Sequence, residues 1–229
     1  MEKWNVLVIT AHPDDEVSCG GTLAKLAEQG HSVTIAIATN GNRGTQDTSV
    51  KPEQLAQTRE KEMADAARIL GVNQVIQLGF DDGTLSEQPD LKERIFRLIR
   101  NEKPDVVITL DAWKKWEFHP DHRALGLAAA EAAYLADSYG YYPKHLEEGI
   151  QPWKPREVYL LWSDEPNYTV DVTDTWEAKL QAADSHVSQG SGGKTFKENY
   201  LRHVQSASKD GELRKTESFR KIYGSSYLI

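Results

Sequence analysis

The stretch Val6-Leu7-Val8-Ile9-Thr10-Ala11-His12-Pro13-Asp14-Asp15-Glu16 decides the fold of this chain. Its first half is a run of β-branched and aliphatic residues, typical of a strand that is buried on both faces of a parallel sheet. Its second half places an imidazole and three carboxylates directly after that strand. Because open α/β sheets bind their ligands at the carboxyl ends of strands, the stretch predicts a site as well as a fold.

Two interpretations of the polar half are open from these residues alone. His12 and Asp15 can be ligands of a divalent ion such as zinc, with Asp14 free to act as a base on a bound water. Alternatively, the segment is a polar turn in which the aspartates cap the next helix. A second cluster, His119-Pro120-Asp121-His122, favours the metal site because His122 supplies a third ligand.

Strand and helix patterns alternate along the chain. Strands are expected at 4–10, 32–38, 74–78, 105–110, 156–162 and 168–172, and helices at 20–29, 52–70, 90–102, 121–137 and 174–188. This order predicts a three-layer, Rossmann-like α/β fold: a mostly parallel sheet with helices on both faces, a small C-terminal strand pair and a helical tail. We expect a single domain over 1–229, with a Rossmann-like core at 1–137 and additional strands and helices at 138–229.

A dinucleotide-binding function is disfavoured, although the expected topology is similar. The turn after the first strand lacks the G-x-G-x-x-G pattern. Its three acidic side chains would repel a pyrophosphate.

The composition is ordinary for a globular protein of 229 residues, with 39% hydrophobic and 27% charged residues. No apolar run approaches the roughly 20 residues that span a bilayer. The net charge of −8 argues against broad binding to nucleic acid or to an anionic membrane. We expect a cytoplasmic protein, because the N-terminus lacks a signal-peptide pattern.

Cys19 is the only cysteine, and it is either a small packed residue or a reactive thiol.

Two residues beside His122 have candidate roles of their own. His119 can stabilise the oxyanion that forms when a carbonyl is attacked and can protonate the leaving amine. Asp121 can orient one of the histidines. For both residues the alternative is that they cap the alanine-rich helix that begins here.

The two clusters resemble the motifs of the LmbE / PIG-L family of zinc-dependent de-N-acetylases, which act mostly on substrates that contain N-acetylglucosamine. The similarity extends through Gly20-Gly21-Thr22-Leu23, residues 39–45 and 78–83, and His186-Val187-Ser188-Gln189. Residues 166–174, and Trp113 ahead of Glu117-Phe118-His119, are most similar to the diacetylchitobiose deacetylase branch.

The resemblance implies one Zn²⁺ per chain, held by His12, Asp15 and His122. It implies Asp14 as the base and His119 as the acid or oxyanion stabiliser. A small N-acetylated sugar as substrate and a homo-oligomeric assembly are further implications.

The resemblance also implies that Arg59 and Asp82 approach the sugar. From the residues alone, another interpretation is equally open for each: Arg59 can be a solvated helix residue, and Asp82 can be a turn residue, without contact with a sugar. Trp113 is expected to line the mouth of the site, although such aromatics are as often anchors of a subunit interface.

The roles of Trp116, Glu16 and His186 stay open. The remaining histidines have no supporting pattern and are expected on the surface: His31, His145 and His203.

We therefore expect a metal-dependent amidohydrolase that releases acetate from N-acetylglucosamine or diacetylchitobiose. One alternative is a deacetylase of a conjugate, such as the glucosaminyl-malate of bacillithiol synthesis. An alternative of another class is a catalytically inactive metal-binding protein, which the presence of Asp14 and His119 beside a complete ligand set disfavours.

Overall fold

The computed structural model describes residues 2–190, 194–207 and 214–223, and one seven-stranded sheet runs through them in the order β3-β2-β1-β4-β5-β7-β6. The strands are β1 (Asn5–Thr10), β2 (Ser32–Thr39), β3 (Gln74–Phe80), β4 (Val106–Leu110), β5 (Glu157–Leu161), β6 (Tyr168–Asp171) and β7 (Thr216–Tyr223). Neighbours among β1 to β5 are parallel, whereas β7 is antiparallel to both β5 and β6. The predicted fold class is confirmed.

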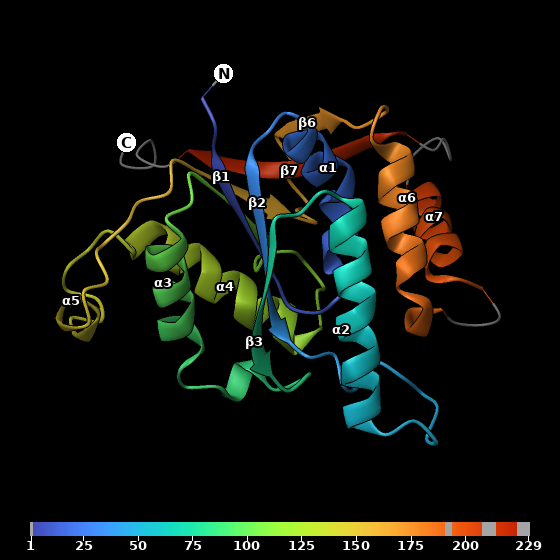
Figure 1. Ribbon diagram of the computed structural model, residues 1–229, viewed down its shortest axis with the longest axis horizontal. Coiled ribbons are helices and arrows are strands. Elements are labelled where there is room, and N and C mark those ends of the chain that lie inside the picture. Colours follow the sequence, from blue (N-terminus) through green and yellow to red (C-terminus); the bar gives the residue numbers. More distant parts are fainter. Residues whose placement is uncertain (1, 191–193, 208–213, 224–229) are drawn as a thin grey trace.

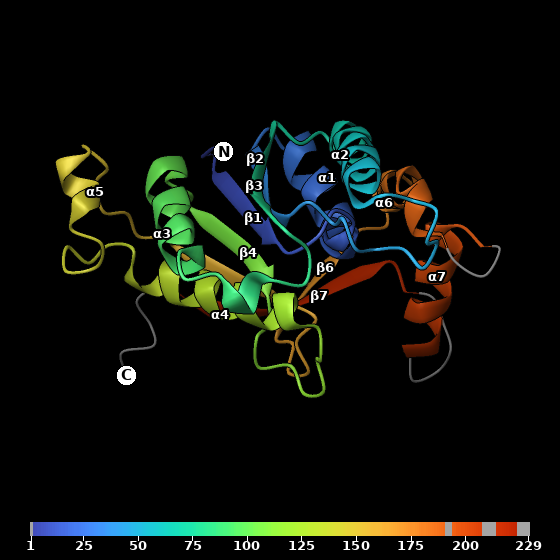
Figure 2. The ribbon, with the colours of Figure 1, turned by 90° about the horizontal axis from the view of Figure 1, so that it is seen from below.

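Helices cover both faces of the sheet. They are α1 (Gly20–Glu28), α2 (Pro52–Ile69), α3 (Leu91–Glu102), α4 (Pro120–Leu135), α5 (Lys144–Glu147), α6 (Trp176–Ser185) and α7 (Phe196–Ala207), with 3-10 turns η1 (Asp15–Cys19), η2 (Leu85–Glu87) and η3 (Val187–Gln189). Figures 1 and 2 show α3 and α4 on one face and α1, α2 and α6 on the other. Among the described residues, no helix is long and apolar enough to cross a membrane.

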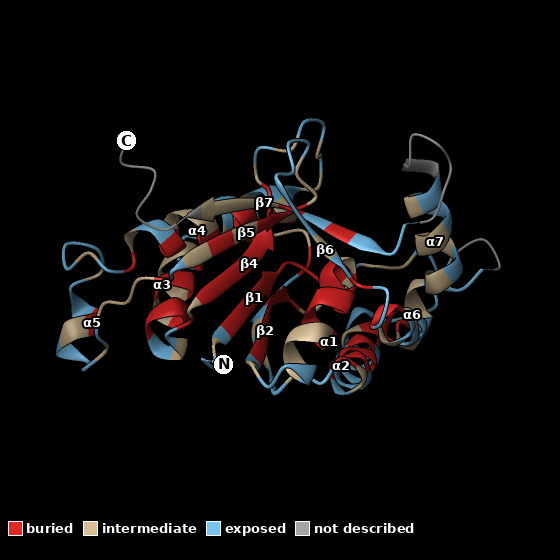
Figure 3. Ribbon diagram, turned by 90° about the horizontal axis from the view of Figure 1, so that it is seen from above, coloured by how far each residue is buried: buried red, intermediate tan, exposed pale blue. Residues whose placement is uncertain are grey.

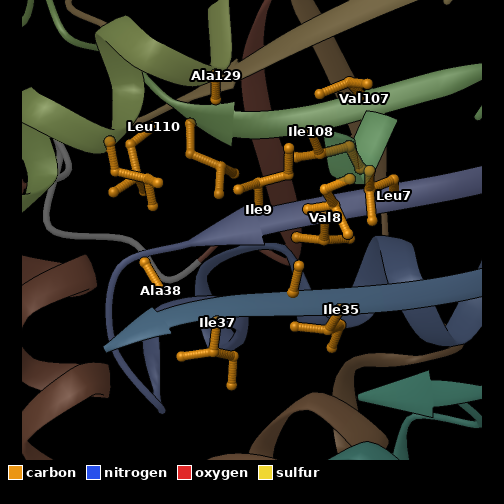
Figure 4. Packing of buried hydrophobic residues seen from close by; sticks show 14 of the residues in the cluster. Leu7, Val8, Ile9, Ile35, Ile37, Ala38, Val107, Ile108, Leu110 and Ala129 are labelled. Atoms are coloured by element: carbon orange, nitrogen blue, oxygen red, sulfur yellow. The ribbon is translucent and has the colours of Figure 1, made fainter. Parts of the chain in front are cut away.

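The central strands are buried along almost their whole length, as their apolar sequences predict. Every residue of β4 is buried, and so are the last five of β1 (Figure 3). Figure 4 shows side chains such as Val8, Ile35 and Ile108 packed together between the layers. A rigid, doubly covered centre of this kind fixes the positions of the loops that leave its strands.

A close approach of α4 to the sheet depends on Gly126. A Cβ atom at this position would lie 2.6 Å from the carbonyl oxygen of Leu110, the last residue of β4. Because glycine has no side chain, the helix that begins with the second histidine cluster lies directly against the end of β4.

The C-terminal region departs from its prediction at one element. A helical tail is confirmed at α7, but Thr216–Tyr223 forms β7 rather than a helix, and it separates β5 from β6. The tail residues 208–213 and 224–229 lie outside the described residues. Glu217 fastens β7 to α1, since its carboxylate accepts the backbone N–H groups of Gly21 (2.9 Å) and Thr22 (2.8 Å) and pairs with Lys179.

Two histidines expected on the surface are not exposed. His145 is fully buried: its Nδ1 lies 2.9 Å from the guanidinium of Arg100 and its Nε2 3.1 Å from Glu93. His31 is half-buried, and its Nδ1 accepts the backbone N–H of Trp4. Cys19 is also fully buried, and burial raises the pKa of its thiol, which favours the packed interpretation.

Candidate active site

The two histidine clusters meet at the point where the sheet changes direction. From β1 the chain proceeds outward to β2 and β3, then returns to the other side of β1 to form β4 and β5. The loops after β1 and β4 therefore diverge, and doubly wound sheets bind their ligands in the crevice that such loops flank. His12 follows β1 by two residues, and His122 lies in the first turn of α4, the helix after β4.

Three predicted ligands bring their donor atoms together in this crevice. Nδ1 of His12 lies 3.2 Å from Nε2 of His122. Asp15 lies 3.7 Å from both atoms, through Oδ2 to His12 and Oδ1 to His122. Oδ2 of Asp15 is held by the backbone N–H groups of Ala11 (3.0 Å) and His12 (2.9 Å). Ligand atoms around a tetrahedral zinc ion lie about 3.3 Å apart, so the spacing and donor chemistry fit such an ion.

The outer nitrogen of His12 faces two carboxylates. Its Nε2 lies 3.2 Å from Oδ2 of Asp121 and 3.2 Å from Oδ1 of Asp82. Asp121 is fully buried and is fixed by the backbone N–H groups of Gly83 (2.6 Å) and Leu85 (2.9 Å). Burial disfavours the charged form of His12, but hydrogen bonds to both carboxylates raise its pKa to about 10. With its outer N–H directed to these acids, the imidazole turns Nδ1 inward, where loss of the second proton would leave a lone pair for a metal ion.

The outer nitrogen of His122 has a similar setting. Its Nδ1 lies 3.5 Å from Oε1 of Glu117, which also accepts the backbone N–H of His119 at 2.9 Å. Despite burial, these partners hold the pKa of Glu117 below its usual range. Trp162, at the end of β5, covers His122 at 5.0 Å between ring centroids, and its indole N–H donates to Ser18.

His119 lies beside these ligands and caps α4. Its Nδ1 accepts the backbone N–H of Asp121 at 3.3 Å, so its neutral ring carries the proton on Nε2. Burial and the positive charges of His12 and His122 lower its pKa. The three imidazoles also lie close enough to hold an ion among themselves, which makes His119 an alternative to Asp15 as third ligand.

Asp14 has a strained backbone and a perturbed carboxyl group. Its φ is 110°, a left-handed conformation that residues other than glycine rarely adopt. Its N–H donates to Oε2 of Glu16 at 2.8 Å. Burial raises the pKa of Asp14 to about 7, against the opposing charge of Arg59. The side chain keeps an exposed fraction of 17%, so a substrate or water can reach it.

Arg59 is buried in the floor of the site rather than solvated. From α2 its guanidinium reaches Oδ2 of Asp14 at 3.1 Å, the carbonyl oxygen of Gly41 at 3.1 Å, and the carbonyl oxygen of Pro13. Gly41 and Gly44 make room for it, because a Cβ atom at either position would lie 2.5 Å from its Nη1. Arg59 thereby joins the loop after β2 to the loop that carries Asp14.

The other two residues expected near the sugar lie in different settings. Asp82 is buried, with Oδ1 on His12 and Oδ2 accepting the backbone N–H of Arg43 at 3.3 Å, so its contacts orient the His12 ring. Trp113 is 62% exposed and lines a cavity of about 450 Å³ with Asp164 and Arg220. Contact of either residue with a sugar stays a prediction.

Trp162 and Glu117 are contacts that the sequence did not assign. The signal for Trp162 was its position at the end of a strand, where residues of parallel sheets face the ligand crevice. Glu117 stands two residues before His119, but its carboxylate contact with His122 depends on the path of the loop after β4.

Comparison with known proteins identifies the family of this chain. The model of the family described as "PIG-L: GlcNAc-PI de-N-acetylase" matches residues 7–133. A diacetylchitobiose deacetylase of Thermococcus kodakarensis is 37% identical over 185 residues, which cover 80% of this chain and 69% of that protein. A probable N-acetyl-alpha-D-glucosaminyl L-malate deacetylase 2 of Bacillus cereus is 32% identical over 195 residues, 82% of this chain and 84% of that protein.

A solved structure extends the likeness to the whole fold. The N,N'-diacetylchitobiose deacetylase from Pyrococcus horikoshii superimposes with a TM-score of 0.89 at 32% identity, and the match covers 100% of this chain and 87% of that one. The family model spans the strand ends and loops that carry both histidine clusters. The resemblance expected from the sequence is confirmed, and the chain belongs to the PIG-L family of de-N-acetylases.

Proposed function

We propose that this protein hydrolyses the acetamide group of N-acetylglucosamine or diacetylchitobiose and releases acetate. The observation that carries the proposal is the inward convergence of His12 Nδ1, His122 Nε2 and Asp15 beside Asp14. Electron-pair donors at this spacing are held together by a proton or by a metal cation between them, and a set of two imidazoles and a carboxylate suits a metal cation. A metal cation next to a buried carboxylate that can accept a proton is the arrangement that a metal-dependent hydrolase requires.

The ion that we propose is zinc, one per chain, held by His12, Asp15 and His122. Imidazole and carboxylate donors suit zinc, and three protein ligands leave a coordination position open. When bound, zinc lowers the pKa of a water molecule and polarises a carbonyl oxygen. Other divalent ions share these ligands, so the metal has to be measured.

The residues around the ion divide the proton transfers of amide hydrolysis. Asp14 takes a proton from the attacking water as the new C–O bond forms at the carbonyl carbon. The Nε2–H of His119 donates to the oxygen that becomes negative. The C–N bond then breaks, the sugar nitrogen takes up the proton that Asp14 had accepted, and acetate leaves.

The substrate contacts that we propose come from side chains around the three ligands. Arg59 touches Asp14, which supports a place near the acyl group, and Trp162 covers His122 at the side of the crevice. Asp121 and Asp82 support the orientation of His12. Trp113 remains a candidate for more distant parts of a sugar.

A single domain over residues 1–229 is part of the proposal. The hydrogen-bonded pairing of β4 with β5 joins the predicted core at 1–137 to the region after it within one sheet, which supports this division. The homo-oligomer and the cytoplasmic location remain predictions.

The proposal is tested by acetate release from a panel of N-acetylglucosamine, diacetylchitobiose and N-acetylglucosaminyl malate. Metal-free protein is prepared with a chelator and assayed with and without added Zn²⁺. We expect turnover of at least one of the first two sugars, and its loss without metal. Preference for the malate conjugate would select the alternative substrate, and no release from any member with metal bound would select an inactive metal-binding protein.

Asp14→Asn provides the matched variant, since it keeps the shape of the side chain and removes the base. We expect zinc binding to persist while kcat falls about 10²–10⁴-fold. Near-normal turnover by this variant would remove Asp14 from its proposed role.

A further inference from the structure

Glu16 and His186, 170 positions apart in the sequence, form a fully buried pair. Nε2 of His186 lies 2.7 Å from Oε1 of Glu16, and neither side chain is exposed. Burial disfavours the charged form of His186, but the carboxylate of Glu16 outweighs it and raises the pKa of His186. A buried pair of this kind costs desolvation, and removing one partner would leave the other polar group buried without a partner.

The second oxygen of Glu16 holds the backbone of Asp14. Oε2 accepts the N–H of Asp14 at 2.8 Å, two residues back along the chain. Asp14 has a φ of 110°, which an L-residue keeps only where its surroundings enforce it. The hydrogen bond from Glu16 is therefore one restraint that keeps the Asp14 carboxylate in the crevice.

His186 is itself anchored independently of the site. It follows α6, and the next turn, η3, is fastened to α2 through Glu62, whose carboxylate accepts the N–H and the hydroxyl of Ser188, each at 2.7 Å. Among the described residues, Nδ1 of His186 has no hydrogen-bond partner. The contact of Nε2 with Glu16 is thus the hydrogen bond that determines how the His186 ring is oriented.

We propose that His186 is a positioning residue for Asp14. It fixes the carboxylate of Glu16, and Glu16 in turn fixes the strained backbone from which Asp14 faces the attacking water. The inference rests on the proposed role of Asp14 as base. The polar contact that the structure gives His186 goes to Glu16 and not to His12, Asp15 or His122, so its loss should disturb the chemical step rather than metal or substrate binding.

Three substitutions of His186 test this step. His186→Leu removes the donor, His186→Asn keeps a polar amide that is too short to reach Glu16, and His186→Gln places an amide N–H near the position of Nε2. We expect kcat to fall at least tenfold in the Leu and Asn variants, with KM and zinc stoichiometry unchanged, and to recover mostly in the Gln variant. If the Leu variant does not fold, the comparison of Asn with Gln decides.

Ser188→Ala is the matched control, because it loosens the same segment at Glu62 without touching Glu16. We expect its kcat to stay within about twofold of the unaltered protein. An equal loss of kcat in Ser188→Ala and His186→Asn would overturn the proposal in favour of general loosening, and so would a failure of Gln to recover activity.

A second readout does not depend on any substrate. Hydrogen exchange at the backbone amide of Asp14, followed by NMR, reports the hydrogen bond to Glu16 directly. We expect exchange at least tenfold faster in His186→Asn than in His186→Gln. Unchanged exchange would overturn the positioning role, whereas faster exchange in a protein that deacetylates none of the sugars would refute the proposed function and leave this structural link standing.

Discussion

The Nε2 atom of His12 lies 3.2 Å from Oδ2 of Asp121, although 109 residues separate them along the chain. The contact orients the ring so that Nδ1 faces His122. Asp121 cannot turn away, because backbone N–H groups of Gly83 and Leu85 hold both of its oxygens. One carboxylate thus connects the ends of β1, β3 and β4 at the proposed metal site.

Asp121→Asn is expected to weaken zinc binding about 10- to 100-fold, because an amide cannot accept from His12 and from both backbone groups as a carboxylate does. The dissociation constant is measured by competition with a chromogenic chelator. Asp65→Asn serves as the control, since it makes the same chemical change on the exposed face of α2. Equal affinities of the two variants would contradict the orienting role of Asp121.

Asp15→Ala and His119→Ala distinguish the two sets of ligands that the geometry permits. If Asp15 is the third ligand, Asp15→Ala binds less than one zinc per chain, whereas His119→Ala binds one zinc and loses about 10²–10⁴-fold in kcat. Metal content after dialysis and acetate release are measured on the same preparations. The reverse pattern of metal content would assign His119 to the ion.

Trp162→Leu is expected to raise KM for the sugar about two- to tenfold, the effect of losing one aromatic contact of roughly 0.5–1.5 kcal/mol. The ring covers His122 at the side of the crevice, so a sugar at the ligands meets it. Trp116→Leu provides the control, because its side chain is 83% exposed. Trp113→Leu tests the earlier prediction for that residue, which an unchanged KM would contradict.

The sequence predicted the sheet because its central strands are covered on both faces and read as apolar runs. It did not predict β7, because a charged residue occupies a buried position there and breaks the alternation of the strand. Glu217 faces inward, toward Lys179 and the start of α1. Such a strand becomes recognisable only when the partner of its buried charge is known.

The candidate site was likewise predictable in part from the sequence. His12, Asp15 and His122 were expected together because strand ends of a parallel sheet meet at one edge. The partners of Arg59 and Glu16 were not predictable, since each depends on how helices on one face are placed against the loop after β1. Short motifs specify donor atoms, whereas the contacts that orient those atoms come from packing between distant segments.

Gly126→Ala is expected to destabilise the protein by about 1–3 kcal/mol, because the added methyl group would overlap the carbonyl oxygen of Leu110 at 2.6 Å. At this chain length the loss lowers the melting temperature by several degrees, which thermal unfolding followed by circular dichroism measures. The same overlap pushes α4 away from β4 and carries His122 with it, so zinc affinity should fall in the folded variant.

Gly20→Ala is the matched control for this prediction. It makes the same change in α1, where a methyl group would lie at an ordinary van der Waals distance of 3.5 Å from its nearest atoms. A melting temperature as low as that of Gly126→Ala in this control would show that the loss of glycine, rather than the close approach of α4, determines the stability.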